Sequence, residues 1–127
     1  MTLKVTAFDP ALDFKVIHQT ETTNTANVNA AGGPCRLLSI NVNNAGGAAA
    51  CYLRLYDGEG VVVGTTFPQM SFKCAQGDTV RVSIPSGILY TNLNFWVTRN
   101  ATELDNTTPL MSSGSDKVLT TFVVQPD

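Results

Sequence analysis

Apolar and polar residues alternate one by one along several stretches of this chain, and this pattern limits the possible fold more than any other feature. In residues 38–43 every second side chain is apolar, from Leu38 through Ile40 to Val42. Because successive side chains of a β-strand point to opposite faces, this period indicates strands with one face on a core. No apolar stripe with a period of 3.6 residues is long enough to predict a helix. The sequence therefore predicts an all-β fold.

Turn signals separate the alternating stretches at intervals of roughly ten residues, which is typical of sandwiches and barrels. Asp57–Gly60 is predicted to be a tight turn, and Pro85 is expected to end the strand before it because proline cannot donate to a central ladder. Residues 99–117 are rich in Asn, Thr, Ser and Asp and predict a long exposed loop. The expected strands are Leu38–Asn43, Cys51–Tyr56, Val61–Val63, Met70–Cys74, Val80–Ile84, Leu93–Thr98 and Val118–Val124.

The first thirty residues have a less regular pattern. Residues 3–7 and 13–20 have strand-like composition, whereas residues 20–27 are almost wholly polar. We expect residues 1–30 to form either an arm or edge strands. With the strands above, this predicts one antiparallel β-sandwich of about eight strands that spans residues 1–127 as a single domain.

Neutral polar residues, rather than charged ones, dominate the polar part of the composition. Charged residues make up 14% of the chain, against about 25% in an average soluble domain. The chain has 16 Thr and 10 Asn, and its eight Lys and Arg are scattered singly at a net charge of −2. We therefore expect no nucleic-acid binding, because no basic stripe is present to contact phosphates. No apolar stretch is long enough for a membrane span or a signal peptide, so no membrane association is expected.

Three cysteines, Cys35, Cys51 and Cys74, cannot all pair within one chain. Their spacings match no zinc motif. We expect reduced, partly buried thiols in a protein that is made in a cytoplasm.

The residue types that carry catalysis are sparse. His18 is the single histidine and has no flanking nucleophile motif. The carboxylate pairs Asp57 with Glu59 and Glu103 with Asp105 fall in predicted turns and loops, where such side chains usually face water. The 57–59 turn also has too few oxygen donors for a calcium loop. We expect a non-enzymatic protein with no catalytic residue, no metal and no cofactor.

Side chains that alternate with the core positions give one candidate surface. Residues 51, 53 and 55 are predicted to face the core, so that Tyr52, Arg54 and Tyr56 face the other way, and Trp96 likewise lies opposite the core face of its strand. Since Tyr, Trp and Arg are enriched at protein interfaces, these four residues are the candidate protein interface. A solvated face or a second buried layer would produce the same pattern.

The stretch from Arg36 to Pro109, about three fifths of the chain, resembles a group of small virion proteins of tailed bacteriophages. The resemblance implies a jelly-roll-like β-sandwich that serves as a capsid decoration or cement protein, commonly as a homotrimer at junctions between capsid subunits. The implied partner is the major capsid protein or another virion protein, and the implied location is the virion, assembled in the cytoplasm of a bacterial host. The three cysteines and the first thirty residues depart from the pattern of the group. The segments that carry the resemblance are Leu37–Asn44, Ala48–Asp57, Val63–Pro68, Gln69–Ile84, Pro85–Tyr90 and Leu93–Pro109.

Two other functions are open at this point. A carbohydrate- or receptor-binding module of a tail fibre or tailspike would use exposed aromatic side chains, for which Tyr52, Tyr56, Tyr90 and Trp96 are the candidates. A hydrolase would need His18 or Asp57 in a catalytic role.

Overall fold

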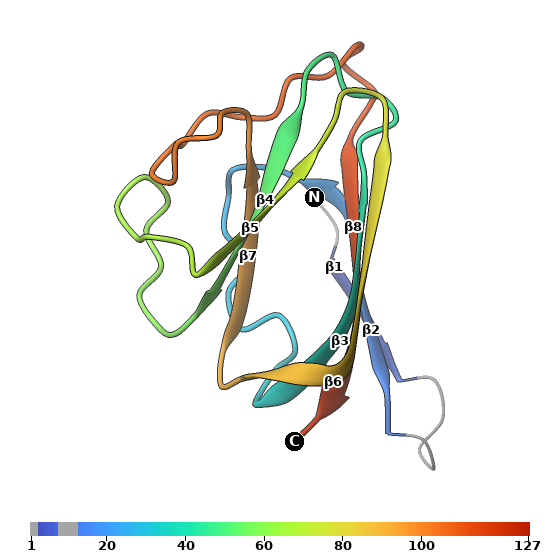
Figure 1. The fold of residues 1–127 in the computed structure, drawn as a ribbon, viewed down its shortest axis with the longest axis vertical. Coiled ribbons are helices and arrows are strands. Elements are labelled where there is room, and N and C mark those ends of the chain that lie inside the picture. Colours follow the sequence, from blue (N-terminus) through green and yellow to red (C-terminus); the bar gives the residue numbers. More distant parts are fainter. Residues whose placement is uncertain (1–2, 8–12) are drawn as a thin grey trace.

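The computed structural model describes residues 3–7 and 13–127, apart from the side chains of Thr6 and Ala7. These residues form eight β-strands and no helix, which confirms the all-β prediction (Figure 1). The strands are β1 (Leu3–Ala7), β2 (Lys15–Thr22), β3 (Cys35–Asn43), β4 (Cys51–Asp57), β5 (Met70–Cys74), β6 (Thr79–Tyr90), β7 (Leu93–Thr98) and β8 (Val118–Pro126). They make a five-stranded sheet in the order β1-β2-β8-β3-β6 and a three-stranded sheet in the order β5-β4-β7, packed face to face as a sandwich.

The strand pairs are antiparallel and nested within one another along the chain. β2 pairs with β8, β3 pairs with β6, and β4 pairs with β5. One long hairpin that folds over on itself produces this nested order of strand pairs. The order is that of a jelly roll.

The segment 23–31 takes the place of a fourth strand in the small sheet. Asn27 and Phe95 exchange backbone hydrogen bonds of 2.8 and 3.2 Å. The carbonyl oxygen of Thr23 accepts from the amide of Val97, and the amide of Ala30 donates to Leu93. The outer edge of β7 is therefore paired, and this flank of the sandwich is closed.

The opposite flank, between β5 and β6, is less completely covered. Tyr90 bridges it with a hydrogen bond from its hydroxyl to the Met70 sulfur, 3.5 Å away. Six inward side chains of these two edge strands are only half-buried, although they pack on the core: Met70, Phe72, Val80, Val82, Ile84 and Ile88.

The core lies between the two sheets and is built from the alternating positions of the inner strands. Phe95 and Phe122 meet at its centre, with ring centroids 4.5 Å apart. The predicted final strand is confirmed, because Val118, Thr120, Phe122 and Val124 are all buried. The predicted strands at Met70–Cys74 and Leu93–Thr98 are confirmed at both ends.

One predicted strand is wrong. Residues 61–63 belong to an irregular connection between β4 and β5, and not to a strand. β4 already pairs with β5 on one side and β7 on the other, so it offers no edge to a third strand. The backbone of this connection turns at Gly60 and Gly64, which have φ values of 70° and 92°.

The prediction that Pro85 ends a strand is also wrong. β6 runs through Pro85 to Tyr90. The missing amide is tolerated because β6 is an edge strand that pairs only with β3, and the register is irregular between Leu37 and Ser39, opposite this point. Gly87, with φ of 73°, accommodates the irregularity.

For the first thirty residues the sequence predicted either an arm or edge strands. Residues 3–7 form an edge strand. β2, however, is an inner strand between β1 and β8. The parts of that prediction that concern residues 1–2 and 8–12 lie outside the described residues.

Candidate protein-binding surface

The outer face of the small sheet carries the four residues selected from the sequence. On β4 the expected alternation is confirmed, with Cys51, Leu53 and Leu55 in the core. Tyr52 and Tyr56 lie on the other face and are half-buried. Arg54 lies on that face too, but it does not face solvent, since it is only 1% exposed.

Arg54 is buried because the loop after β7 folds over it. Its Nη2 atom donates to the carbonyl oxygens of Asn100, at 2.6 Å, and Thr102, at 2.9 Å. Its Nε donates to Thr98 Oγ1 at 3.2 Å, and its Nη1 donates to Ser71 Oγ at 2.8 Å. The guanidinium therefore joins three strands and the loop at one point.

The charge of Arg54 is balanced at longer range. Burial lowers the pKa of its guanidinium, and the carboxylates of Asp105 and Glu103 act against that shift. The Tyr52 ring adds a cation–π contact, with the guanidinium carbon 5.2 Å from the ring centroid. The contacts of Arg54 are thus structural within this chain.

Trp96 stands directly opposite Arg54 in the register of β4 and β7. It is 1% exposed, so of the alternatives left open for this face a second buried layer describes Trp96. Its indole N–H has no hydrogen-bond partner among the described residues. Tyr90, at 3% exposure, is also buried. Of the four aromatic candidates for carbohydrate stacking, Tyr52 and Tyr56 remain partly accessible.

The loop over Arg54, residues 99–110 (the 99–110 loop), is tied by its own side chains. Asp105 accepts hydrogen bonds from the backbone amide of Asn100, at 2.9 Å, and from Thr107 Oγ1, at 2.7 Å. Burial acts to raise the pKa of Asp105, but the hydrogen bonds from Thr107 and Asn100 outweigh it and lower the pKa. Arg99 closes the base through bonds to Thr107 and Thr108. No named strand lies between Thr98 and Val118, in agreement with the loop predicted at residues 99–117, and the hydrogen bonds above tie its first part together.

A second loop, residues 58–69 (the 58–69 loop), is fixed at its base. The backbone amide of Asp57 donates to Gln69 Oε1 at 3.0 Å, and Gln69 Nε2 donates back to the Asp57 carbonyl. Buried Asn94 donates to the carbonyl oxygens of Tyr56 and Gly58, at 3.0 and 2.7 Å. The carboxylate of Asp57 accepts the amides of Thr91 and Asn92, both at 2.9 Å, so it serves as a turn cap.

The two loops lie beside one another and project from the same side of the small sheet (Figure 1). A side-chain carbon placed at Gly64 would lie 3.3 Å from Asn106, which shows how closely they approach. Val62 and Phe67 in the 58–69 loop are 55% and 60% exposed. Neither residue was predicted from the sequence to lie on a contact surface; the only signal there is Phe67, an aromatic residue in a segment without alternation.

The remaining sequence candidates do not meet. His18 lies on β2 in the large sheet, where its Nδ1 is 2.7 Å from Thr121 Oγ1. Asp57 ends β4 in the small sheet, and Asp105 belongs to the 99–110 loop. No three His, Cys, Asp or Glu within residues 3–7 and 13–127 are grouped as a metal site.

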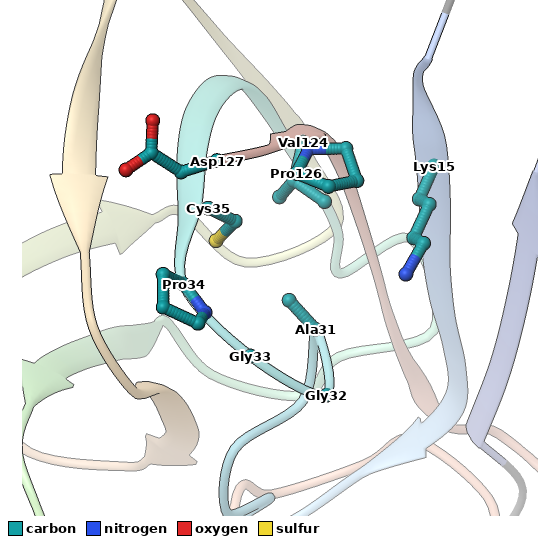
Figure 2. Close-up of a pocket in the computed structure, with 9 residues that line it drawn as sticks. All are labelled: Lys15, Ala31, Gly32, Gly33, Pro34, Cys35, Val124, Pro126 and Asp127. Carbon is teal, nitrogen blue, oxygen red and sulfur yellow. The ribbon is translucent and has the colours of Figure 1, made fainter.

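A cavity of about 190 Å³ lies at the end of the sandwich where β3 begins and β8 ends. Figure 2 shows the Lys15 side chain on one side of it and Cys35, with the 31–34 turn, on the other. Burial raises the pKa of Cys35 to about 11, so its thiol stays protonated near neutral pH. The cavity is smaller than the roughly 300 Å³ at which ligand pockets begin.

Among the described residues there is no helix that is long and apolar enough to cross a membrane. Comparison with known proteins gives no match to a family model, to a curated protein or to a solved structure. The site is therefore interpreted from its own geometry.

Proposed function

We propose that this chain is a non-enzymatic virion protein of a tailed bacteriophage that decorates and stabilises the capsid, with the major capsid protein as its partner. The two projecting loops are the contact surface. The virion setting comes from the sequence resemblance over residues 36–109, and the choice of surface comes from the loop geometry.

The observation that carries the proposal is the exposure of Val62 and Phe67 on a loop that is held in place. More than half of each side chain is open to solvent. Exposure alone does not distinguish them, since Leu89 is 54% exposed; what favours a protein contact is that two such side chains lie on one projecting loop with a fixed base. Because Arg54, Asn94 and Gln69 fix the two loops in advance, binding loses little conformational entropy.

The polar surface fits adhesion by shape and hydrogen bonding. At a net charge of −2 the chain has little long-range electrostatic attraction to offer a partner. Affinity would then come from repetition, as a homotrimer that contacts several capsid subunits at once. The trimer is part of the proposal.

A sedimentation assay with capsids that lack this protein tests the contact surface. Phe67→Asp and Val62→Asp should each reduce capsid binding by 10-fold or more, because a charge replaces the apolar contact. Leu89→Asp is the matched control, since Leu89 is 54% exposed on β6 of the other sheet. Equal binding of Phe67→Asp and Leu89→Asp would contradict the choice of surface.

Particle heating tests the function itself. Particles that carry the protein should release their DNA at a higher temperature than particles without it.

A glycan array tests the alternative of a carbohydrate- or receptor-binding module. Binding to glycans together with no binding to capsids would overturn the proposal.

A further inference from the structure

Two of the three cysteines face each other across the small sheet. Cys51 is the first residue of β4 and Cys74 is the last residue of β5, and they are direct partners in the antiparallel register. Both side chains are fully buried on the core side. Directly opposite residues in such a pair have Cα atoms roughly 4.5–5.5 Å apart. A disulfide bond spans this separation.

The two thiols also influence each other. Burial raises the pKa of Cys51 to about 12, and the neighbouring Cys74 side chain adds to the rise. Burial likewise raises the pKa of Cys74. Both groups are therefore thiols, and unreactive, while the sheet stays closed.

Cys35 is placed differently and provides a control within the chain. It begins β3, whereas Cys74 Sγ donates to the carbonyl oxygen of Val42, 3.7 Å away, near the other end of that strand. Seven residues of extended strand separate these points by roughly 23 Å. Cys35 therefore cannot reach either of the other two cysteines in the folded chain.

Cys74 is the more accessible member of the pair once the sheet opens locally. It ends an edge strand, and the four residues that follow it, 75–78, are exposed. Met70 and Phe72, the other inward residues of β5, are only half-buried. Because β5 is paired on one side only, its end can open locally at a lower cost than global unfolding.

We propose that Cys51 and Cys74 are a site of oxidative modification, at which a small disulfide compound converts the two thiols into one intrachain disulfide bond. The Cys74 thiolate attacks the small disulfide, which forms a mixed disulfide and releases one small thiolate. The Cys51 thiolate then attacks Cys74 Sγ in the mixed disulfide and releases the second small thiolate. The two protons lost by the cysteines go to the two released thiolates, so one small disulfide is reduced to two thiols.

The bond would close a ring that contains the whole 58–69 loop. It would fix β5 to β4 at the end of β5 that is followed by the exposed turn. The oxidised chain should therefore be more stable than the reduced chain, with a thermal midpoint higher by roughly 10 °C.

The test exposes the reduced full-length chain to oxidised glutathione at mildly alkaline pH, and then alkylates the remaining thiols in denaturant. We expect a product lighter by two hydrogens, with one alkylated cysteine, and a proteolytic map that links Cys51 to Cys74. The same oxidant acting on the denatured chain should give mixed pairings, which shows that the fold selects the pair.

The variants Cys35→Ala and Cys74→Ala distinguish a bond between Cys51 and Cys74 from a bond that involves Cys35. Cys35→Ala should still form the bond and should show the rise in thermal midpoint on oxidation, whereas Cys74→Ala should show neither. Three alkylated cysteines in the folded wild-type chain, a lasting glutathione adduct, or a bond to Cys35 would each overturn the proposal. The wild-type peptide map decides the matter even if a variant does not fold.

Discussion

Arg54 Nη2 donates a hydrogen bond of 2.6 Å to the carbonyl oxygen of Asn100. This contact joins the middle of β4 to the first turn of the 99–110 loop. Arginine is enriched at protein interfaces, but Arg54 is buried and holds the 99–110 loop in place.

Replacement of Arg54 by methionine keeps an unbranched apolar stem but removes every donor. We expect the free energy of unfolding to fall by about 2–3 kcal/mol, because buried acceptors in the loop and on Thr98 lose their partner. The stability of Arg54→Lys should lie between those of the wild type and Arg54→Met. One ammonium group cannot reach acceptors on β5, on β7 and in the loop together. Urea unfolding followed by the fluorescence of Trp96 measures the difference. An Arg54→Met chain as stable as wild type would contradict the structural role.

Asp105 should make the 99–110 loop sensitive to acid. Its pKa in the folded chain is lowered, whereas the unfolded value is about 3.9. Its stabilising contribution is therefore present above the unfolded pKa and is lost as the pH falls through the folded pKa. Asp105→Asn should be less stable than wild type at about pH 7, and the difference should shrink towards about pH 3. A difference that stays constant with pH would show that the carboxylate charge is not involved.

The side chain of Gln19 should stabilise the closed flank of the sandwich, where the segment 23–31 pairs with β7. Its Nε2 donates to Asn27 Oδ1 at 2.8 Å, and both residues are buried. Gln19→Ala should cost about 1–2 kcal/mol and should speed hydrogen exchange of the Phe95 amide, which donates to Asn27. His18→Ala removes a contact on the outer face of the same strand and should leave that exchange rate unchanged. Equal effects of the two substitutions would contradict the assignment.

Any substitution of Gly87 is expected to lower the stability of the fold. Its φ of 73° is strained for any other residue, and an added Cβ would collide with the Arg36 side chain. Gly87→Ala should destabilise the fold by about 1 kcal/mol or more. Gly114→Ala is the control, because the space around Gly114 is open, and its effect should be close to zero. Thermal unfolding of the two variants compares them directly.

The sequence predicted the strands best where apolar residues recur at every second position. Leu93–Thr98 and Met70–Cys74 match at both ends, although both faces of the first are buried and two of the three inward residues of the second are only half-buried. The prediction failed at Pro85 and at residues 61–63, where the outcome depends on whether a strand lies at the edge of its sheet. That position is set by distant pairings, which local alternation does not encode.

The candidate surface was predicted only in part. The alternation correctly placed Arg54 and Trp96 opposite the core, but it could not reveal that both are buried or that a loop from elsewhere in the chain covers Arg54. Burial of Arg54 depends on carbonyl oxygens more than forty residues away in the sequence. Val62 and Phe67 gave no periodic signal, since the loop that exposes them has no regular structure.

The nested strand pairs have a consequence for how the chain reaches its native state during synthesis. β2 leaves the ribosome well before its partner β8, which lies about a hundred residues later, with His18 opposite Thr121. Contacts of such high sequence separation make folding slow, because a long stretch of chain must be ordered before they form. The large sheet cannot be completed during translation until residues 118–126 emerge, so the edge of β2 that pairs with β8 keeps its backbone groups unpaired until then.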